Sequence, residues 1–245
     1  MRVIGALALA LSVVTGLGYL ASQTILARPG FDPARSPYYV SAPAPTEVES
    51  VAPAGRPVGV PVVDDAWLST VSARTGIPAP ALRAYARVQL AGDAGCPVGW
   101  TTLAGIGWVE SHHGTLGGRS LRASGRPSSR ILGPALDGRG SFAAIEAAPG
   151  SRSFHGDERW EHAVGPMQFL PASWRSWATD GDGDGRADPH DLDDAAATAA
   201  RYLCASGGDL STGDGWQAAV LTYNHAQSYV DAVHSAATAY ARRSG

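Results

Sequence analysis

The sequence contains no lysine, since all 19 basic residues of this 245-residue chain are arginines. That absence excludes a Schiff-base lysine, the lysine of a Walker A phosphate loop and a serine–lysine dyad. A positive charge excess is missing as well, because 22 acidic residues bring the formal net charge to −3, and we expect no nucleic-acid partner. The chain has only two cysteines, which cannot form a zinc cluster alone but can form one disulfide.

The N-terminal stretch 3–21 is almost entirely apolar, and no charge lies between Arg2 and Arg28. Such a run approaches the roughly 20 residues that span a bilayer, and it also fits the apolar part of a signal peptide. We therefore expect residues 1–27 to be a signal peptide or a retained signal anchor, and the sequence leaves both open. Both alternatives place the remaining chain outside the cytoplasm, secreted or anchored at the membrane.

Residues 28–62 are rich in proline and poor in large apolar side chains, with eight of the 17 prolines of the chain. Such a segment cannot bury a core, and its proline density favours an extended spacer. The remaining residues 63–245 are enough for one hydrophobic core. We expect a spacer followed by a single globular, monomeric domain.

The globular part is predicted to be mostly α-helical. Start signals such as Asp64, Pro80 and Pro171 precede helical patterns, and Gly76 and Gly92 follow two of them. The expected helical segments are 66–74, 81–92, 101–114, 171–179, 193–206, 214–226 and 227–243. Region 114–160 is rich in Gly, Arg and Ser without periodicity, so we expect long loops there, with room for one short strand pair.

The two cysteines, Cys96 and Cys204, stand about 100 residues apart. Export favours a disulfide between them, because thiols outside the cytoplasm are commonly oxidised. Two buried free thiols are the alternative.

Glu110 is the first candidate catalytic residue. It shares a helical stripe with Leu103, Ile106 and Gly107, so its carboxyl should be partly desolvated. Desolvation raises a carboxyl pKa, and a carboxyl that stays protonated near neutral pH can act as a general acid. A buried Glu paired with an Arg is the structural alternative. Glycines at 105 and 107 should let another backbone or a ligand approach this helix.

Two further segments carry polar groups suited to binding sugars. Gln168 follows the Gly165-Pro166 turn and offers donors and an acceptor, although it can equally tie the loop to the backbone. Tyr223 and Asn224 combine a phenol with an amide near a helix end, although a core tyrosine is common.

The segment 180–191, DGDGDGRADPHD, is similar to the calcium loop of an EF-hand. It has Asp at offsets 1, 3, 5 and 9 and Gly at offset 6, whereas offset 12 carries Asp191 instead of a bidentate Glu. Either Asp193 or Asp194, just beyond, can supply that last ligand. A solvated acidic turn is the alternative.

In this order, these segments resemble the B-type family of lytic murein transglycosylases. The matching stretches are WVESHHG around Glu110, ILGPALDG at 131–138, AVGPMQFLPASW at 163–174, the Asp-rich loop and YNHAQSYV at 223–230. The resemblance implies a lysozyme-like, mostly helical domain. Two features depart from the family: DERWEHA stands where some members have a small polar residue, and region 114–160 has its own composition.

The resemblance also implies site residues and partners. Glu110 would be the catalytic acid, with substrate contacts from Ser111, Gln168, Tyr223 and Asn224. Structural calcium would be held by Asp180, Asp182, Asp184, the Arg186 carbonyl and Asp194. The substrate would be the glycan strands of peptidoglycan, cut without water to leave 1,6-anhydro-muramic ends.

Two other functions remain open from the sequence. A hydrolysing muramidase of the goose-lysozyme kind would use a second carboxylate, for which the candidates are Asp137, Asp157, Glu158 and Glu161. A non-catalytic, calcium-bound wall module would leave Glu110 salt-bridged or exposed. The pair His112-His113 lacks a third metal ligand at a defined spacing, and Trp108, Trp174 and Trp177 are candidates for stacking on sugars.

Overall fold

The computed structural model describes residues 42, 59–92, 94–140, 143–207 and 209–245. The expected signal or anchor segment 1–27 and nearly all of the proline-rich linker 28–62 lie outside these ranges. Among the described residues, no helix is both long and apolar enough to cross a membrane.

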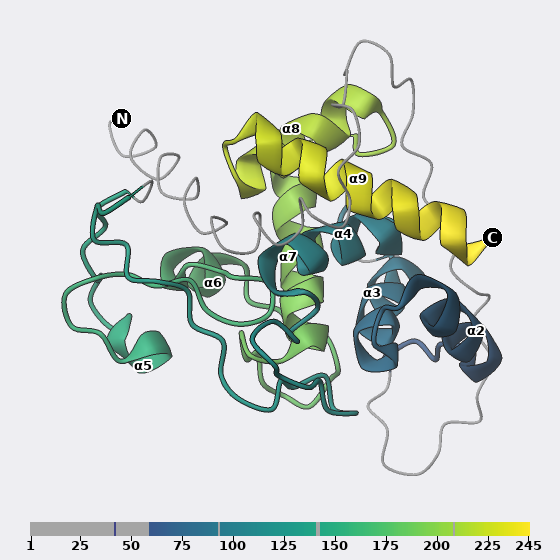
Figure 1. Cartoon of the computed structure of the whole chain (residues 1–245), viewed down its shortest axis with the longest axis horizontal. Helices are drawn as coiled ribbons and strands as arrows, with labels where there is room; N and C mark the ends of the chain where they lie inside the picture. Colours follow the sequence, from purple (N-terminus) through teal and green to yellow (C-terminus); the bar gives the residue numbers. More distant parts are fainter. Residues whose placement is uncertain (1–41, 43–58, 93, 141–142, 208) are drawn as a thin grey trace.

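The described part of the chain is mostly helical, as predicted. Its helices are α2 (Asp65–Thr75), α3 (Ala79–Ala91), α4 (Trp100–Ser111), α5 (Arg152–His155), α6 (Pro171–Trp177), α7 (Leu192–Gly207), α8 (Gly213–Tyr223) and α9 (Gln227–Ser244). Each of the seven expected helices is present, and the single-turn α5 was not expected. In Figure 1, α7 stands at the centre, α9 crosses above it, and α5 and α6 lie among loops on the left.

The helix ends follow from local chemistry. The Asp64 carboxylate accepts a hydrogen bond from the Trp67 amide at 2.7 Å and so caps α2, which ends at Gly76 in the left-handed conformation. Proline stands in the first turn of α3 and of α6, where its missing N–H costs nothing. These short-range signals are why the sequence located the helices well.

Helix α4 lies in the interior, packed against α3, α7 and α9, and almost all of its residues are buried. Its glycines allow this packing. A Cβ at Gly105 would lie 2.7 Å from the Val233 carbonyl oxygen of α9, and one at Gly107 would collide with the Tyr85 hydroxyl of α3. The close approach that these glycines predicted is therefore made by neighbouring helices.

Region 114–160 consists mainly of loops, as expected, joined by isolated antiparallel bridges. Two of the bridges are Asp137↔Ala144 and Glu146↔Trp160. Leu136, Ala163 and Leu170 form a small apolar cluster under these loops, separate from the main core. The loops thus have an interior of their own and pack beside the helical frame (Figure 1).

Cys96 and Cys204 form a disulfide, with their Cα atoms 5.5 Å apart. The bond joins the connection between α3 and α4 to the last turns of α7. It closes a loop of 108 residues.

Reducing this disulfide should lower the melting temperature. In the chain-entropy model, a bridge over a loop of this length contributes about 4 to 5 kcal/mol. Thermal unfolding of residues 63–245 with and without reductant measures the effect, and a Cys96→Ala/Cys204→Ala variant controls for effects of the reductant. If neither the reductant nor the double substitution lowered the melting temperature, the disulfide would not be stabilising.

Candidate functional site

Glu110 lies in the last turn of α4 and is partly buried. Burial raises the pKa of its carboxyl to about 8. The negative end of the helix dipole acts in the same direction, because it disfavours another negative charge. Glu110 therefore stays mostly protonated at neutral pH while part of its surface remains accessible.

The hydrogen-bond partner of Glu110 is Tyr229, in the first turn of α9. The Tyr229 hydroxyl donates to Glu110 Oε1 at 2.6 Å. Burial and the nearby Glu110 carboxyl raise the pKa of Tyr229 well above its ordinary value, so the phenol keeps its proton and remains a donor. The ring of Tyr223 stacks parallel to that of Tyr229, with centroids 6.3 Å apart. Tyr229 was not among the predicted site residues, although it lies within the YNHAQSYV segment.

Ser111 and Tyr223 both hold the turn 165–168. The Ser111 hydroxyl donates to the Pro166 carbonyl at 2.6 Å, and the Tyr223 hydroxyl donates to the Met167 carbonyl at 2.8 Å. Both side chains are buried, Ser111 completely. In this structure they position the turn 165–168, and the substrate contact expected of them stays a prediction.

Gln168 is partly buried and adopts a positive φ of 49°, a strained conformation for a residue other than glycine. Its side-chain amide donates to the Gly165 carbonyl at 2.8 Å, so one end of the amide ties the turn together. Strain of this kind persists only where surrounding contacts enforce it, and it is common at functional sites.

Asn224 is buried just after α8, and its side-chain oxygen accepts from the Ala226 amide at 3.2 Å. It organises the entry into α9, which carries Tyr229. The structure thus brings the predicted residues 110, 111, 168 and 223 together around one turn, with Asn224 supporting the helix that supplies Tyr229.

The adjacent histidines have separate partners. His113 is buried, and its ring nitrogens contact the hydroxyls of Tyr85 at 3.1 Å and Tyr240 at 2.9 Å. Burial lowers the pKa of His113 to about 3. The His112 ring stacks on Trp108 with centroids 4.0 Å apart, so one face of Trp108 is already covered.

The acidic residues considered as a second carboxylate pair with basic side chains of their own region. The pairs are Asp137–Arg139, Asp157–His162, Glu158–Arg152 and Glu161–His155. Each of the four carboxylates therefore contacts a basic side chain within residues 137–162.

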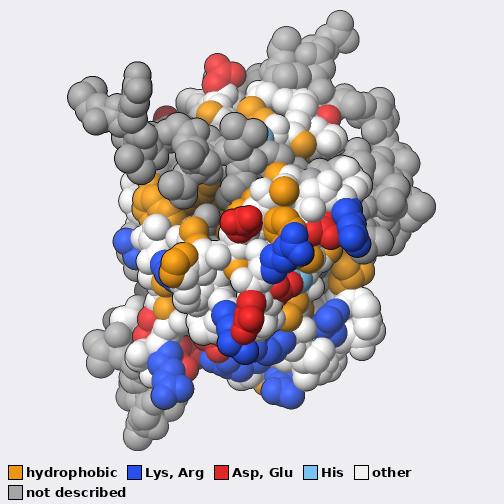
Figure 2. Space-filling view, turned by 90° about the vertical axis from the view of Figure 1, so that its left-hand side faces the viewer, with side chains coloured by type: hydrophobic (Ala, Val, Ile, Leu, Met, Phe, Trp, Pro, Cys, Tyr) orange, Lys and Arg blue, Asp and Glu red, His pale blue; other side chains and the backbone are white. Residues whose placement is uncertain are grey.

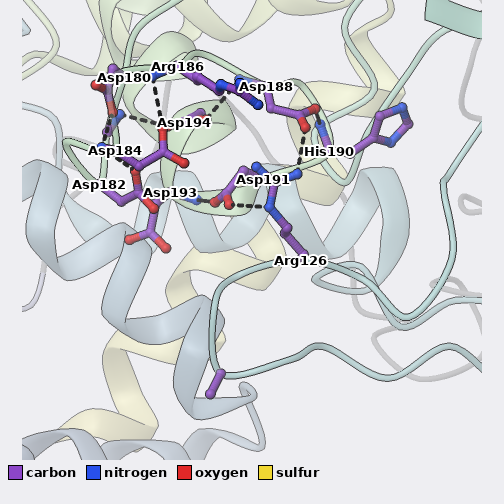
Figure 3. Close-up of polar contacts among 12 residues, drawn as sticks. Arg126, Asp180, Asp182, Asp184, Arg186, Asp188, His190, Asp191, Asp193 and Asp194 are labelled. Carbon is purple, nitrogen blue, oxygen red and sulfur yellow. Dashed lines mark hydrogen bonds and ion pairs between the residues drawn. The ribbon is translucent and has the colours of Figure 1, made fainter.

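Two carboxylates of the Asp-rich loop converge with one from the first turn of α7 (Figure 3). Ligand oxygens of Asp180, Asp182 and Asp194 all lie within 4.8 Å of one another. Burial and the neighbouring carboxylates raise the pKa of Asp194 to about 7, although hydrogen bonds from backbone amides act in the opposite direction. A convergent set of hard oxygen donors is what Ca²⁺ takes as ligands, so the residues present fit that ion.

Two other predicted ligands lie at the edge of this cluster. Asp184 is outside the converging set, and its Oδ1 accepts from the Arg186 amide at 2.9 Å. The Arg186 side chain is exposed, and its predicted contribution is the backbone carbonyl alone.

The neighbouring acidic side chains have arginine partners from outside the loop. Arg126 contacts Asp188 at 2.5 Å and Asp191 at 3.2 Å, and Arg87 contacts Asp193 at 2.7 Å. Figure 3 shows Arg126 reaching the loop from below. No local sequence pattern predicts these partners. Because Arg126 forms an ion pair with Asp191, Asp194 is favoured as the residue that completes the cluster.

The loop also supports the turn beside Glu110. Gly165 has a positive φ of 79°, and a Cβ there would collide with the Pro189 carbonyl of the Asp-rich loop. The backbone of the loop therefore packs directly against the turn that carries Gln168.

A family model and two solved structures are similar to parts of this chain. Residues 157–238 match the family model described as a transglycosylase SLT domain. This range includes Gln168, Tyr223, Asn224 and Tyr229, whereas Glu110 precedes it. No curated protein sequence matches the chain.

Two solved structures resemble the fold, both of the Escherichia coli lytic transglycosylase Slt35. The complex with bulgecin A is 17% identical, with a TM-score of 0.42, over 74% of this chain and 75% of that one. The complex with calcium is 16% identical, with a TM-score of 0.43, over 74% of this chain and 76% of that one.

Calcium should raise the melting temperature of the wild-type protein, because an ion that binds only the folded state stabilises it by mass action. Asp194→Asn should abolish this rise, since it removes one charge from the converging set. Asp191→Asn, the matched control, should retain the rise, because Asp191 is engaged by Arg126. Calcium titration followed by thermal unfolding measures all three. The reverse pattern, with the rise lost only in Asp191→Asn, would contradict the ligand assignment.

Proposed function

We propose that the protein is a lytic transglycosylase that cuts the β-1,4 bond between the muramic acid and glucosamine residues of peptidoglycan. The observation that carries this proposal is Glu110, a partly accessible carboxyl whose pKa burial raises to about 8, with a neutral phenol as its partner. The match of residues 157–238 to a transglycosylase SLT domain supports the same reaction class.

In the first step, protonated Glu110 gives its proton to the glycosidic oxygen as the bond from that oxygen to the muramic C1 breaks. Positive charge develops at C1, and the acetamido oxygen of the same sugar stabilises it. Glu110 is left as a carboxylate, and the hydrogen bond from Tyr229 stabilises that anion until the second step.

In the second step, the Glu110 carboxylate takes the proton of the muramic C6 hydroxyl while that oxygen bonds to C1. A 1,6-anhydro ring forms, and Glu110 regains its proton. Attack from within the bound sugar is intramolecular, and such positioning can supply roughly 7 to 11 kcal/mol of the barrier. One carboxylate therefore suffices for the whole cycle.

The turn 165–168 is the proposed wall against which the sugar is held. Gln168 is partly exposed there and is the proposed direct contact, through its amide. Ser111 and Tyr223 act through the turn, and Asn224 acts through the start of α9.

The two other candidate functions receive less support. A hydrolase would need a second carboxylate beside Glu110, whereas each of the four candidates contacts a basic side chain within residues 137–162. A non-catalytic module predicts a salt-bridged or fully exposed Glu110, whereas this carboxyl is partly buried and bonded to a neutral phenol.

Calcium and export complete the proposal. Bound calcium would be held by Asp180, Asp182 and Asp194, with Asp184 and the Arg186 carbonyl at the edge, and would stiffen the loop behind the turn 165–168.

The Cys96–Cys204 disulfide is compatible with a domain, 63–245, that works outside the cytoplasm. Residues 1–27 would direct or anchor it there, and 28–62 would let it reach the wall.

Products that are one water lighter than reducing ends are expected when residues 63–245 act on purified peptidoglycan, as measured by mass spectrometry. Glu110→Gln keeps the shape but removes the transferable proton, so at least a thousandfold loss of turnover is expected. Reducing ends from the wild type would mean hydrolysis, and full activity in Glu110→Gln would rule out the proposed acid.

Whether Glu110→Gln folds correctly can be checked by measuring how its melting temperature depends on pH and comparing the result with the wild type. Burial disfavours the charged carboxylate, so the wild type loses stability as pH rises from about 5 toward 8, where Glu110 ionises. The variant lacks this loss. Its melting temperature relative to wild type should therefore increase over the same range.

Tyr229→Phe should shift the pH profile of kcat/KM. The Tyr229 hydroxyl lowers the pKa of Glu110, so its removal should raise that pKa and move the alkaline limb to higher pH. Activity should also fall about tenfold or more, because the anion between the two steps loses its donor. Tyr240→Phe, whose hydroxyl contacts His113 instead, is the control and should leave the limb in place. An unmoved limb in Tyr229→Phe would contradict direct coupling.

A further inference from the structure

A cavity of about 370 Å³ lies between loop 122–130, the arginine loop, and the Asp-rich loop. Arginines 122, 126 and 130 line it, together with Ser128 and Ser129. Asp188 and His190 close its other side. Figure 2 shows basic side chains, with acidic ones among them, gathered low on the face to which α5, α6 and the loops contribute.

The charges of this cavity are only partly balanced by the protein. Arg126 is neutralised by Asp188 and Asp191. Arg122 donates to the Ser128 carbonyl at 3.4 Å, a neutral acceptor.

Arg130 likewise donates to neutral acceptors, the Phe154 carbonyl at 2.6 Å and Nε2 of His190 at 3.1 Å. Because His190 accepts this bond at Nε2, its ring is neutral and does not balance the positive charge of Arg130. Arg122 and Arg130 thus bring two guanidinium charges to one cavity. Among the described residues, neither forms an ion pair with a carboxylate.

The cavity is built onto the site around Glu110. A Cβ at Gly114, four residues after Glu110, would lie 3.3 Å from both Leu121 and Pro127 of the arginine loop and 3.5 Å from Pro166. Pro127 of this loop therefore lies close to the turn that follows α4, and the Gly165 amide of the turn 165–168 donates to the carbonyl of Ile131, the residue after Arg130, at 2.9 Å. A substrate bound at Glu110 would pass near this loop.

We propose that this cavity binds a carboxylate of the peptide that substitutes the glycan strand, so that the enzyme recognises peptide-bearing strands. This inference rests on the proposed function. Guanidinium forks match the planar, bidentate geometry of a carboxylate. Asp188 in the wall disfavours a dianion such as phosphate more than a monoanion, and the volume suits a small group.

The test measures binding by calorimetry in the Glu110→Gln background, where the sugar chain is not cut. The two ligands are a peptidoglycan tetrasaccharide with its stem peptides and the same tetrasaccharide after an amidase has removed them. Arg122→Gln should weaken binding of the first about tenfold and leave the second unchanged. The matched control is Arg139→Gln, an exposed arginine outside the cavity, which should change neither.

Equal affinity of the two tetrasaccharides, or no effect of Arg122→Gln on the peptide-bearing one, would overturn the inference while leaving the proposed function intact. Competition by millimolar inorganic phosphate together with equal tetrasaccharide affinities would assign the cavity to a phosphate and also overturn it. If the protein binds neither tetrasaccharide, the proposed function fails. A titration with N-acetylalanine, compared between Arg122→Gln and its parent, then still decides whether the cavity takes a carboxylate.

Discussion

The close packing of α4 against α3 and α9 is the constraint on which the site depends. Without side chains at Gly105 and Gly107, α4 can approach the Val233 backbone and Tyr85. This approach takes the end of α4 out of water and brings Tyr229 within hydrogen-bond distance of Glu110. The raised pKa of Glu110 is thus a property of helix packing.

The turn 165–168 connects the end of α4 with α8 and with the Asp-rich loop. Ser111 and Tyr223 hold it from α4 and α8, and the Asp-rich loop packs against Gly165 from behind. Directly after the arginine loop, the Ile131 carbonyl accepts a hydrogen bond from the Gly165 amide of the same turn at 2.9 Å. A structural ion in the Asp-rich loop would therefore act on the site through backbone packing, without taking part in the chemistry.

Local signals predicted the helices, because caps, prolines and terminal glycines act over a few residues. The position of Glu110 could be predicted from its apolar stripe for the same reason. The partner Tyr229, 119 residues away, could not, because only the packing of α9 on α4 brings it there. Burial of Ser111 and Asn224 and the pairing of Arg126 with the Asp-rich loop likewise depend on contacts between distant segments, which no local pattern encodes.

The most direct test of the account is the pKa of Glu110 itself. It can be measured by NMR titration of the carboxyl carbons in ¹³C-glutamate-labelled protein, with Glu110→Gln assigning the signal. A midpoint near 8 is expected, because burial raises the pKa of Glu110 more than the hydrogen bond from Tyr229 lowers it. A midpoint near 4.5, the ordinary value for glutamate, would mean that Glu110 is ionised at neutral pH and cannot be the proton donor proposed for it.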